Sequence, residues 1–122
     1  MGVRVAFVDD SVDLLLLYEI NFQLDERFEV VGQEQTSTNV IDLSRRERPD
    51  VLCLDLYLES DDSLPLIKEL KDTLPSMKVI VLSGSVRDDS TLGKALDAGA
   101  DAFVDKMDWI DDLKPAILKL TA

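Results

Sequence analysis

The stretch VLCLDLYLESDD, residues 51–62, begins with the apolar run VLCL, as a buried β-strand does. An aspartate, Asp55, comes directly after this run and is itself followed by apolar residues. Aspartate is a poor strand former and is seldom fully buried without a partner. The stretch therefore predicts a central strand that ends in a carboxylate, and this carboxylate needs a charged partner.

The rest of the chain alternates between short apolar segments and stretches with helical periodicity. We predict strands over Val3–Val8, Glu29–Gly32, Val51–Leu54, Lys78–Leu82 and Ala102–Val104. Three of these are almost continuously apolar, which is typical of parallel strands covered on both faces. Two helices are expected in the first half of the chain, from Ser11 to about Arg27 and from Ser37 or Thr38 to about Glu47. Two more are expected from Ser63 and Pro65 to before Pro75 and from about Arg87 to Ala98, where Gly99 ends the helix. A last helix is expected to start near Asp108 or Asp111, with Pro115 in its first turn.

Five such β–α units in 122 residues predict an α/β fold: a five-stranded, doubly wound parallel sheet with helices on both faces. The expected strand order is 2-1-3-4-5, which is flavodoxin-like, and residues 1–122 are expected to form a single domain. In such sheets the functional site lies beyond the carboxyl ends of the strands.

Composition excludes several classes of function. The formal net charge of −12 argues against direct nucleic-acid binding by this chain. The sequence has no histidine, which excludes Ser–His–Asp catalysis and His-ligated zinc within the chain. No apolar run approaches the roughly 20 residues of a membrane span. The single cysteine, Cys53, fits a cytoplasmic location.

Polar residues gather where the predicted strands end: Asp9 and Asp10, then Asp55, then Ser83 and Gly84, and finally Lys106. Carboxylates held this close together repel one another, and a divalent cation is the usual remedy. All-oxygen ligands favour Mg²⁺, or Mn²⁺ in its place. A carboxylate nucleophile beside a metal and an ammonium indicates acyl-phosphate chemistry.

In these motifs, VAFVDD, VLCLDL, VIVLSG and GADAFVDK, the sequence resembles a response-regulator receiver domain of two-component signal transduction, from Val3 to about Leu120. The resemblance implies that Asp55 accepts a phosphoryl group from a phosphohistidine on a sensor histidine kinase or a histidine phosphotransfer protein. It implies that Asp10, Asp55 and the Tyr57 carbonyl ligate Mg²⁺, and that Asp9 acts through a metal-bound water.

The same resemblance implies roles for residues around the acceptor. Lys106 is expected to pair with the phosphoryl group, and Ser83, followed by Gly84, to bond one of its oxygens. Phe103 is expected to turn inward as a switch aromatic. Tyr57 and Ser85 occupy the positions linked to phosphoryl lifetime.

The expected protein is thus a signalling switch and not a turnover enzyme. Phosphorylation is expected to change the face formed by the fourth helix, fifth strand and fifth helix, which would control an output domain or effector or support a homodimer. Glu59 and Ser63 replace a proline and a glycine found in many receivers, and Met107 replaces a proline after the lysine. Three alternatives stay open: an aspartate-nucleophile phosphatase, a receiver that signals without phosphate, and a nucleotide- or flavin-binding module, although the first loop has no glycine-rich motif.

Overall fold

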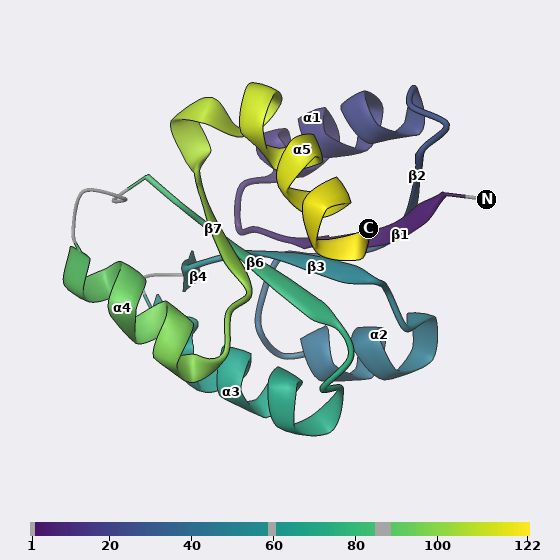
Figure 1. The fold of residues 1–122 in the computed structure, drawn as a ribbon. Helices are drawn as coiled ribbons and strands as arrows, with labels where there is room; N and C mark the ends of the chain where they lie inside the picture. Colours follow the sequence, from purple (N-terminus) through teal and green to yellow (C-terminus); the bar gives the residue numbers. More distant parts are fainter. Residues whose placement is uncertain (1, 59–60, 85–88) are drawn as a thin grey trace.

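The computed structural model describes residues 2–58, 61–84 and 89–122. Strands and helices alternate along this part of the chain (Figure 1). The elements are β1 (Val3–Val8), α1 (Val12–Gln23), β2 (Phe28–Glu34), α2 (Val40–Glu47), β3 (Val51–Asp55), β4 (Tyr57–Leu58), β5 (Asp61–Asp62), α3 (Leu64–Thr73), β6 (Lys78–Ser83), α4 (Asp89–Ala98), β7 (Ala102–Asp105), the 3₁₀ turn η1 (Lys106–Asp108) and α5 (Trp109–Thr121).

The main sheet has five parallel strands in the order β2-β1-β3-β6-β7. The short strands β4 and β5 form a separate antiparallel hairpin, so β6 and β7 are the fourth and fifth strands of the main sheet. The predicted 2-1-3-4-5 order and the doubly wound fold class are therefore confirmed. The sequence did not predict the hairpin, because two-residue strands have no detectable periodicity.

The helices pack in two layers on opposite faces of the sheet (Figure 1). Helices α1 and α5 cover one face around a core that includes Phe7, Tyr18 and Leu113. Helices α2, α3 and α4 cover the other face around a core that includes Leu54 and Ile67. With both faces covered, functional side chains can reach solvent at the ends of the strands. None of the helices in the described ranges is long and apolar enough to cross a bilayer.

Two predicted helix boundaries were wrong. Helix α1 ends at Gln23 instead of near Arg27, because the chain turns into β2 at Phe28. Helix α2 begins after Asn39 rather than after Ser37 or Thr38, so that Val40 can pack in the core. Arg87, the predicted start of the fourth helix, lies outside the described residues.

Helix α5 begins after Asp108, within the predicted range, and Pro115 lies in its second turn. Proline has no N–H group, so the carbonyl four residues earlier loses its helical hydrogen bond. That carbonyl belongs to Asp111, which is exposed, so water can bond it. The buried contacts of Trp109, Leu113 and Ile117 keep the helix continuous across the proline.

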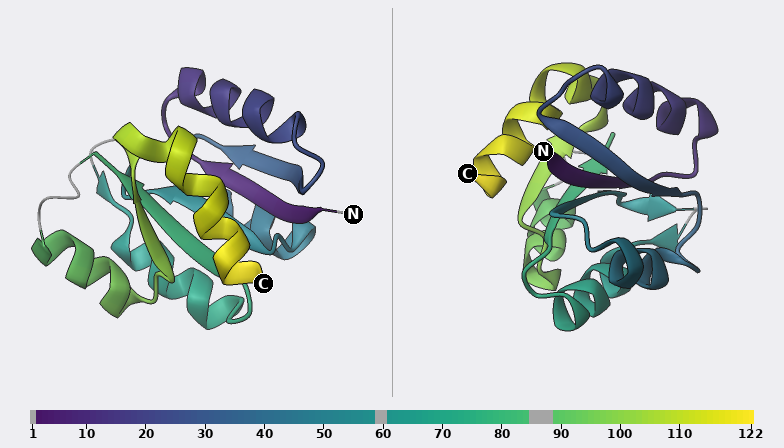
Figure 2. Two further views of the ribbon diagram at one scale, coloured as in Figure 1. Left: turned by 45° about the horizontal axis from the view of Figure 1, so that its top comes forward. Right: turned by 90° about the vertical axis from the view of Figure 1, so that its right-hand side faces the viewer.

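The start of β1 and the end of α5 lie on the side of the sheet where the strands begin (Figure 2). The loops that follow the carboxyl ends of the strands lie on the opposite side. This placement follows from the parallel topology, since β1 starts at that edge and α5 runs back to it. The loops that carry the predicted site residues therefore form the opposite edge.

Candidate functional site

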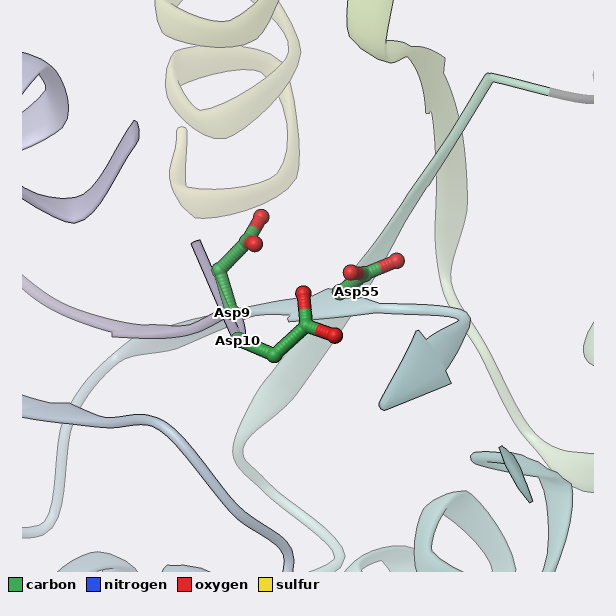
Figure 3. Close-up of side chains that lie close together, drawn as sticks. All are labelled: Asp9, Asp10 and Asp55. Carbon is green, nitrogen blue, oxygen red and sulfur yellow. The ribbon is translucent and has the colours of Figure 1, made fainter. Parts of the chain in front are cut away.

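Three carboxylates meet at the carboxyl edge of the sheet. Asp9 and Asp10 follow β1, and Asp55 is the last residue of β3 (Figure 3). The register of the two strands pairs Val8 with Leu54, which places Asp9 beside Asp55. Each residue offers a carboxylate oxygen, and these oxygens lie within 4.8 Å of one another. The structure thus brings together the three residues that the sequence predicted as metal ligands.

Lys106 reaches this cluster from the other side. It follows β7, and its Nζ lies 2.9 Å from Asp55 Oδ2 and 2.9 Å from Asp9 Oδ2. The two carboxylates are almost inaccessible to solvent, with 1% of the Asp9 side chain and 8% of the Asp55 side chain exposed. The ammonium therefore bridges two buried carboxylates that would otherwise repel each other.

The Asp55 side chain and backbone are both held in place. The Tyr57 N–H donates to Asp55 Oδ1 at 3.2 Å, and the Ser63 hydroxyl donates to the Asp55 carbonyl at 2.7 Å. The Ser63 N–H also donates to the Leu56 carbonyl at 2.6 Å. These bonds hold the loop that contains the β4–β5 hairpin against Asp55.

Sequence reasoning missed these hydrogen bonds of Ser63, which it placed at the start of a helix. The residue does precede α3, but its side chain makes no capping hydrogen bond. A serine at this place can either cap the following helix or bond a backbone carbonyl earlier in the chain, and the sequence does not distinguish the two. The choice depends on how the loop after β3 folds back, which is a tertiary property.

The remaining predicted site residues lie around the cluster. Ser83, buried at the end of β6, pairs in register with Asp105, the residue before Lys106. Gly84 follows it, with open space where a Cβ would stand. Phe103 is partly buried and packs against the core on the α3–α4 side of the sheet. Tyr57 has 42% of its surface exposed beside Asp55, so it stands at the rim. Ser85 lies outside the described residues.

Burial raises the pKa of the Asp55 carboxyl, and the negative charge of Asp9 raises it further. The hydrogen bond and the charge of Lys106 lower this pKa, as does the hydrogen bond from the Tyr57 N–H, but they offset only part of the rise. Burial alone would lower the pKa of Lys106, but its bonds to Asp9 and Asp55 together outweigh that effect and raise it. The lysine is therefore held in its charged form, while the environment of Asp55 disfavours the carboxylate.

The cluster suits a divalent cation. Among the described residues, Lys106 is the cation that contacts Asp9 and Asp55, and the cluster holds three carboxylates. Asp9 Oδ2 is buried and lies 2.9 Å from Lys106 Nζ, without the geometry of a hydrogen bond. Asp10 is exposed to solvent. Hard oxygen donors of this kind fit Mg²⁺ or a similar ion.

The fold and this cluster define a class of protein. The sequence profile of the family described as "Response regulator receiver domain" matches residues 5–118. The chain therefore belongs to the receiver-domain family of two-component response regulators, a family of signal-transduction proteins.

Curated relatives agree with this assignment. The chain is 29% identical over 119 residues to the response regulator protein VraR of Staphylococcus epidermidis, which covers 98% of this chain and 56% of the relative. VraR of Staphylococcus aureus gives the same identity and coverage. The chain thus spans about half the length of the curated relatives it matches.

Solved structures share the fold. The non-phosphorylated receiver domain of RcsB from Escherichia coli superposes with a TM-score of 0.89 at 27% identity, covering 99% of this chain and 94% of that one. The isolated receiver domain of RcsB from Salmonella enterica serovar Typhimurium, solved with the phosphomimetic BeF₃⁻, gives 0.87 at 27% identity, covering 99% and 89%. The CheB response regulator domain of Thermotoga maritima, at 20% identity and a TM-score of 0.89, shows the fold alone, covering 100% and 98%.

Proposed function

We propose that this domain is a phosphorylation-controlled switch in which Asp55 accepts a phosphoryl group from a phosphohistidine. The donor is a sensor histidine kinase or a histidine phosphotransfer protein. The observation that carries the proposal is the bridge from Lys106 to Asp55 and Asp9, with Asp10 beside them. This arrangement places a nucleophilic carboxylate, a cation site and a fixed ammonium around one point.

In the proposed transfer, an Asp55 oxygen attacks phosphorus as the nitrogen–phosphorus bond of the donor breaks. The bonding electron pair stays on the partner's histidine nitrogen. Asp10, Asp55 and the Tyr57 carbonyl would hold Mg²⁺, or Mn²⁺ in its place, with Asp9 acting through a bound water. The metal supplies positive charge against the phosphoryl oxygens. Lys106 is already within contact of Asp55 and can pair with the incoming group without entering from solvent.

The proposed response passes through the neighbouring strands. Ser83 would bond a phosphoryl oxygen, with Gly84 leaving room for the approach, and Phe103 would turn inward behind it. Phe103 and Lys106 belong to the same β7–η1 segment, so movement of one affects the face built by α4, β7 and α5. This face would act on an output domain or effector. Tyr57 and Ser85 would tune how long the phosphoryl group persists.

Acetyl phosphate with Mg²⁺ tests the proposal directly. We expect intact-mass measurement to show the addition of one phosphoryl group, which disappears on treatment with hydroxylamine because acyl phosphates are labile to it. Chelation of divalent cations should prevent the addition. A protein that gains no phosphoryl group under these conditions, or gains one that resists hydroxylamine, would contradict the proposal.

The alternatives have less support from the site. An aspartate-nucleophile phosphatase needs a second acidic residue two positions after the nucleophile, and Tyr57 stands there. We therefore propose that the domain is not a turnover enzyme. Sustained phosphate release from a small phosphomonoester would revive the phosphatase, and signalling that survives loss of the acceptor would favour a receiver that works without phosphate.

The family resemblance implies a homodimer on the face of the fourth helix, fifth strand and fifth helix. We propose instead that a phosphorylation-dependent homodimer forms through an exposed apolar stripe on α1 and its C-cap. Val12, Leu16, Ile20 and Leu24 follow one another at four-residue spacing and are 49–83% exposed. The stripe is tied to the site, because the Ser11 N–H at the start of α1 donates to Asp9 Oδ1 at 2.9 Å. Solved relatives include two RcsB dimers bound to two parallel DNAs.

We expect Ile20→Glu to prevent dimer formation in the presence of Mg²⁺ and BeF₃⁻, because it places a charge in the middle of the stripe. Sedimentation velocity measures the outcome. Leu96→Glu on α4 is the matched control, since Leu96 is 48% exposed and Ile20 is 49% exposed. A dimer lost in the Leu96 variant and kept in the Ile20 variant would move the interface to α4.

Residues 1–122 are proposed to act as one domain, in the cytoplasm, where an unpaired thiol such as that of Cys53 stays reduced. A solved RcsB relative is bound to a promoter, and this chain covers 61% of that longer protein. We propose that the present chain does not bind nucleic acid itself, since its net charge of −12 would repel phosphates.

A further inference from the structure

Tyr18 on α1 is buried below the carboxylate cluster. It is 1% exposed, stacks on Phe7 with ring centroids 5.0 Å apart, and meets Trp109 edge-on at 4.8 Å. These contacts fix the ring, so packing sets the position of the hydroxyl. Nothing in the proposed transfer uses this residue.

The Tyr18 hydroxyl is a buried donor that has no hydrogen-bond partner among the described residues. It lies against the Asp9 carboxylate, whose Oδ2 is likewise buried and without a geometrically complete hydrogen bond. Buried hydroxyls nearly always find a partner, so one left unpaired next to a carboxylate calls for an explanation.

Lys106 supplies that explanation. In the structure its Nζ lies 2.9 Å from Asp9 Oδ2, so an ammonium already stands against the carboxylate beside Tyr18. Under the proposed function, Lys106 leaves Asp9 to pair with the phosphoryl group. Asp9 Oδ2 then loses its cation at the moment when its orientation toward the metal-bound water matters.

We infer that Tyr18 is a positioning residue: its hydroxyl donates to Asp9 when Lys106 moves to the phosphoryl group, and so keeps Asp9 oriented toward the metal. This inference rests on the proposed function. The pKa of Tyr18 is raised, first by burial and next by the charge of Asp9, so the hydroxyl keeps the proton it must donate. Partners that orient metal ligands commonly control metal affinity in this way.

Tyr18→Phe tests the inference by removing the hydroxyl and keeping the ring. Calorimetric titration with Mg²⁺ in excess BeF₃⁻, which stands in for the phosphoryl group, is expected to give an affinity about tenfold weaker than wild type. Without BeF₃⁻, Lys106 remains on Asp9, and the two proteins should bind Mg²⁺ alike. Loss of affinity that is equal in both conditions, or absent in both, overturns the inference.

Thermal melting of the metal-free proteins separates positioning from a merely structural role. The substitution deletes a hydroxyl that is unpaired in this state, so the variant should melt at or above the wild-type temperature; a clear fall would overturn the inference. Ser44→Ala is the matched control, because Ser44 Oγ is also buried and unpaired among the described residues but lies on α2, across the sheet. It should not alter Mg²⁺ affinity in either condition.

The two proposals fail differently. If wild-type protein shows no BeF₃⁻-dependent Mg²⁺ binding, the acceptor site itself is wrong and the role of Tyr18 falls with it. If the wild type binds and Tyr18→Phe binds identically, only the role of Tyr18 is wrong.

Discussion

Asp55→Asn is expected to abolish phosphorylation by acetyl phosphate and, in the absence of divalent cations, to make the protein more stable. Asparagine cannot form an acyl phosphate, so the mass gain should disappear entirely. The gain in stability follows from the raised pKa of Asp55, which burial causes first. We expect a rise in the free energy of unfolding on the order of 1 kcal/mol, a typical size for a single substitution.

The sign of this effect depends on pH. Because the pKa of Asp55 is higher in the folded than in the unfolded protein, its contribution to stability is fully present below the unfolded value, about 3.9, and is lost as the pH rises through the folded value. At neutral pH the carboxylate therefore opposes folding, and asparagine does not. The stability difference between variant and wild type should shrink as the pH falls toward 4.

Urea unfolding at pH 7 and pH 4, together with intact-mass measurement, tests both halves of this prediction. Glu69→Gln is a suitable control, because Glu69 is exposed in the middle of α3 and its loss should change neither property. A phosphoryl group on the Asp55 variant equal to that on wild type would place the acceptor elsewhere.

Lys106→Met is expected to be the most destabilising change at the site when no divalent cation is present. Lys106 contacts two buried carboxylates at 2.9 Å each, and its removal leaves Asp9 and Asp55 facing each other. The expected loss is about 3 kcal/mol, at the low end for a broken buried pair because 20% of the lysine side chain is exposed. Saturating Mg²⁺ should restore most of it by replacing the lost positive charge.

Urea titrations with and without Mg²⁺ measure this rescue. Lys71→Met is the matched control, since Lys71 also pairs with an aspartate at 2.9 Å, Asp101, with 19% of the lysine side chain exposed. Its carboxylate partner is outside the acidic cluster, so Mg²⁺ should not restore its stability. Equal responses of the two variants to Mg²⁺ would show that the ion does not bind between Asp9, Asp10 and Asp55.

Local patterns determined most of the fold and the composition of the site. Continuous apolar runs at β1, β3 and β6 are typical of strands covered on both faces. This pattern involves only neighbouring residues, so it can be recognised in the sequence. Since parallel strands end at one edge, Asp9, Asp55 and Lys106 were predictable as neighbours from their places after three strands. The breaks in helical periodicity were also visible, although Asn39 and Pro115 showed that packing moves helix boundaries away from local preference.

The tertiary structure alone decided how these groups pair. No sequence pattern states that Lys106 lies 2.9 Å from both Asp9 and Asp55, that Ser63 donates to the Asp55 carbonyl, or that the Tyr18 hydroxyl has no hydrogen-bond partner among the described residues. Such contacts depend on strand register and on the rotamers that a close-packed core permits, and these arise from residues far apart in the chain. The sequence by itself thus determined which chemical groups meet at the edge of the sheet where the strand VLCLD ends. Packing decided which of their atoms are in contact.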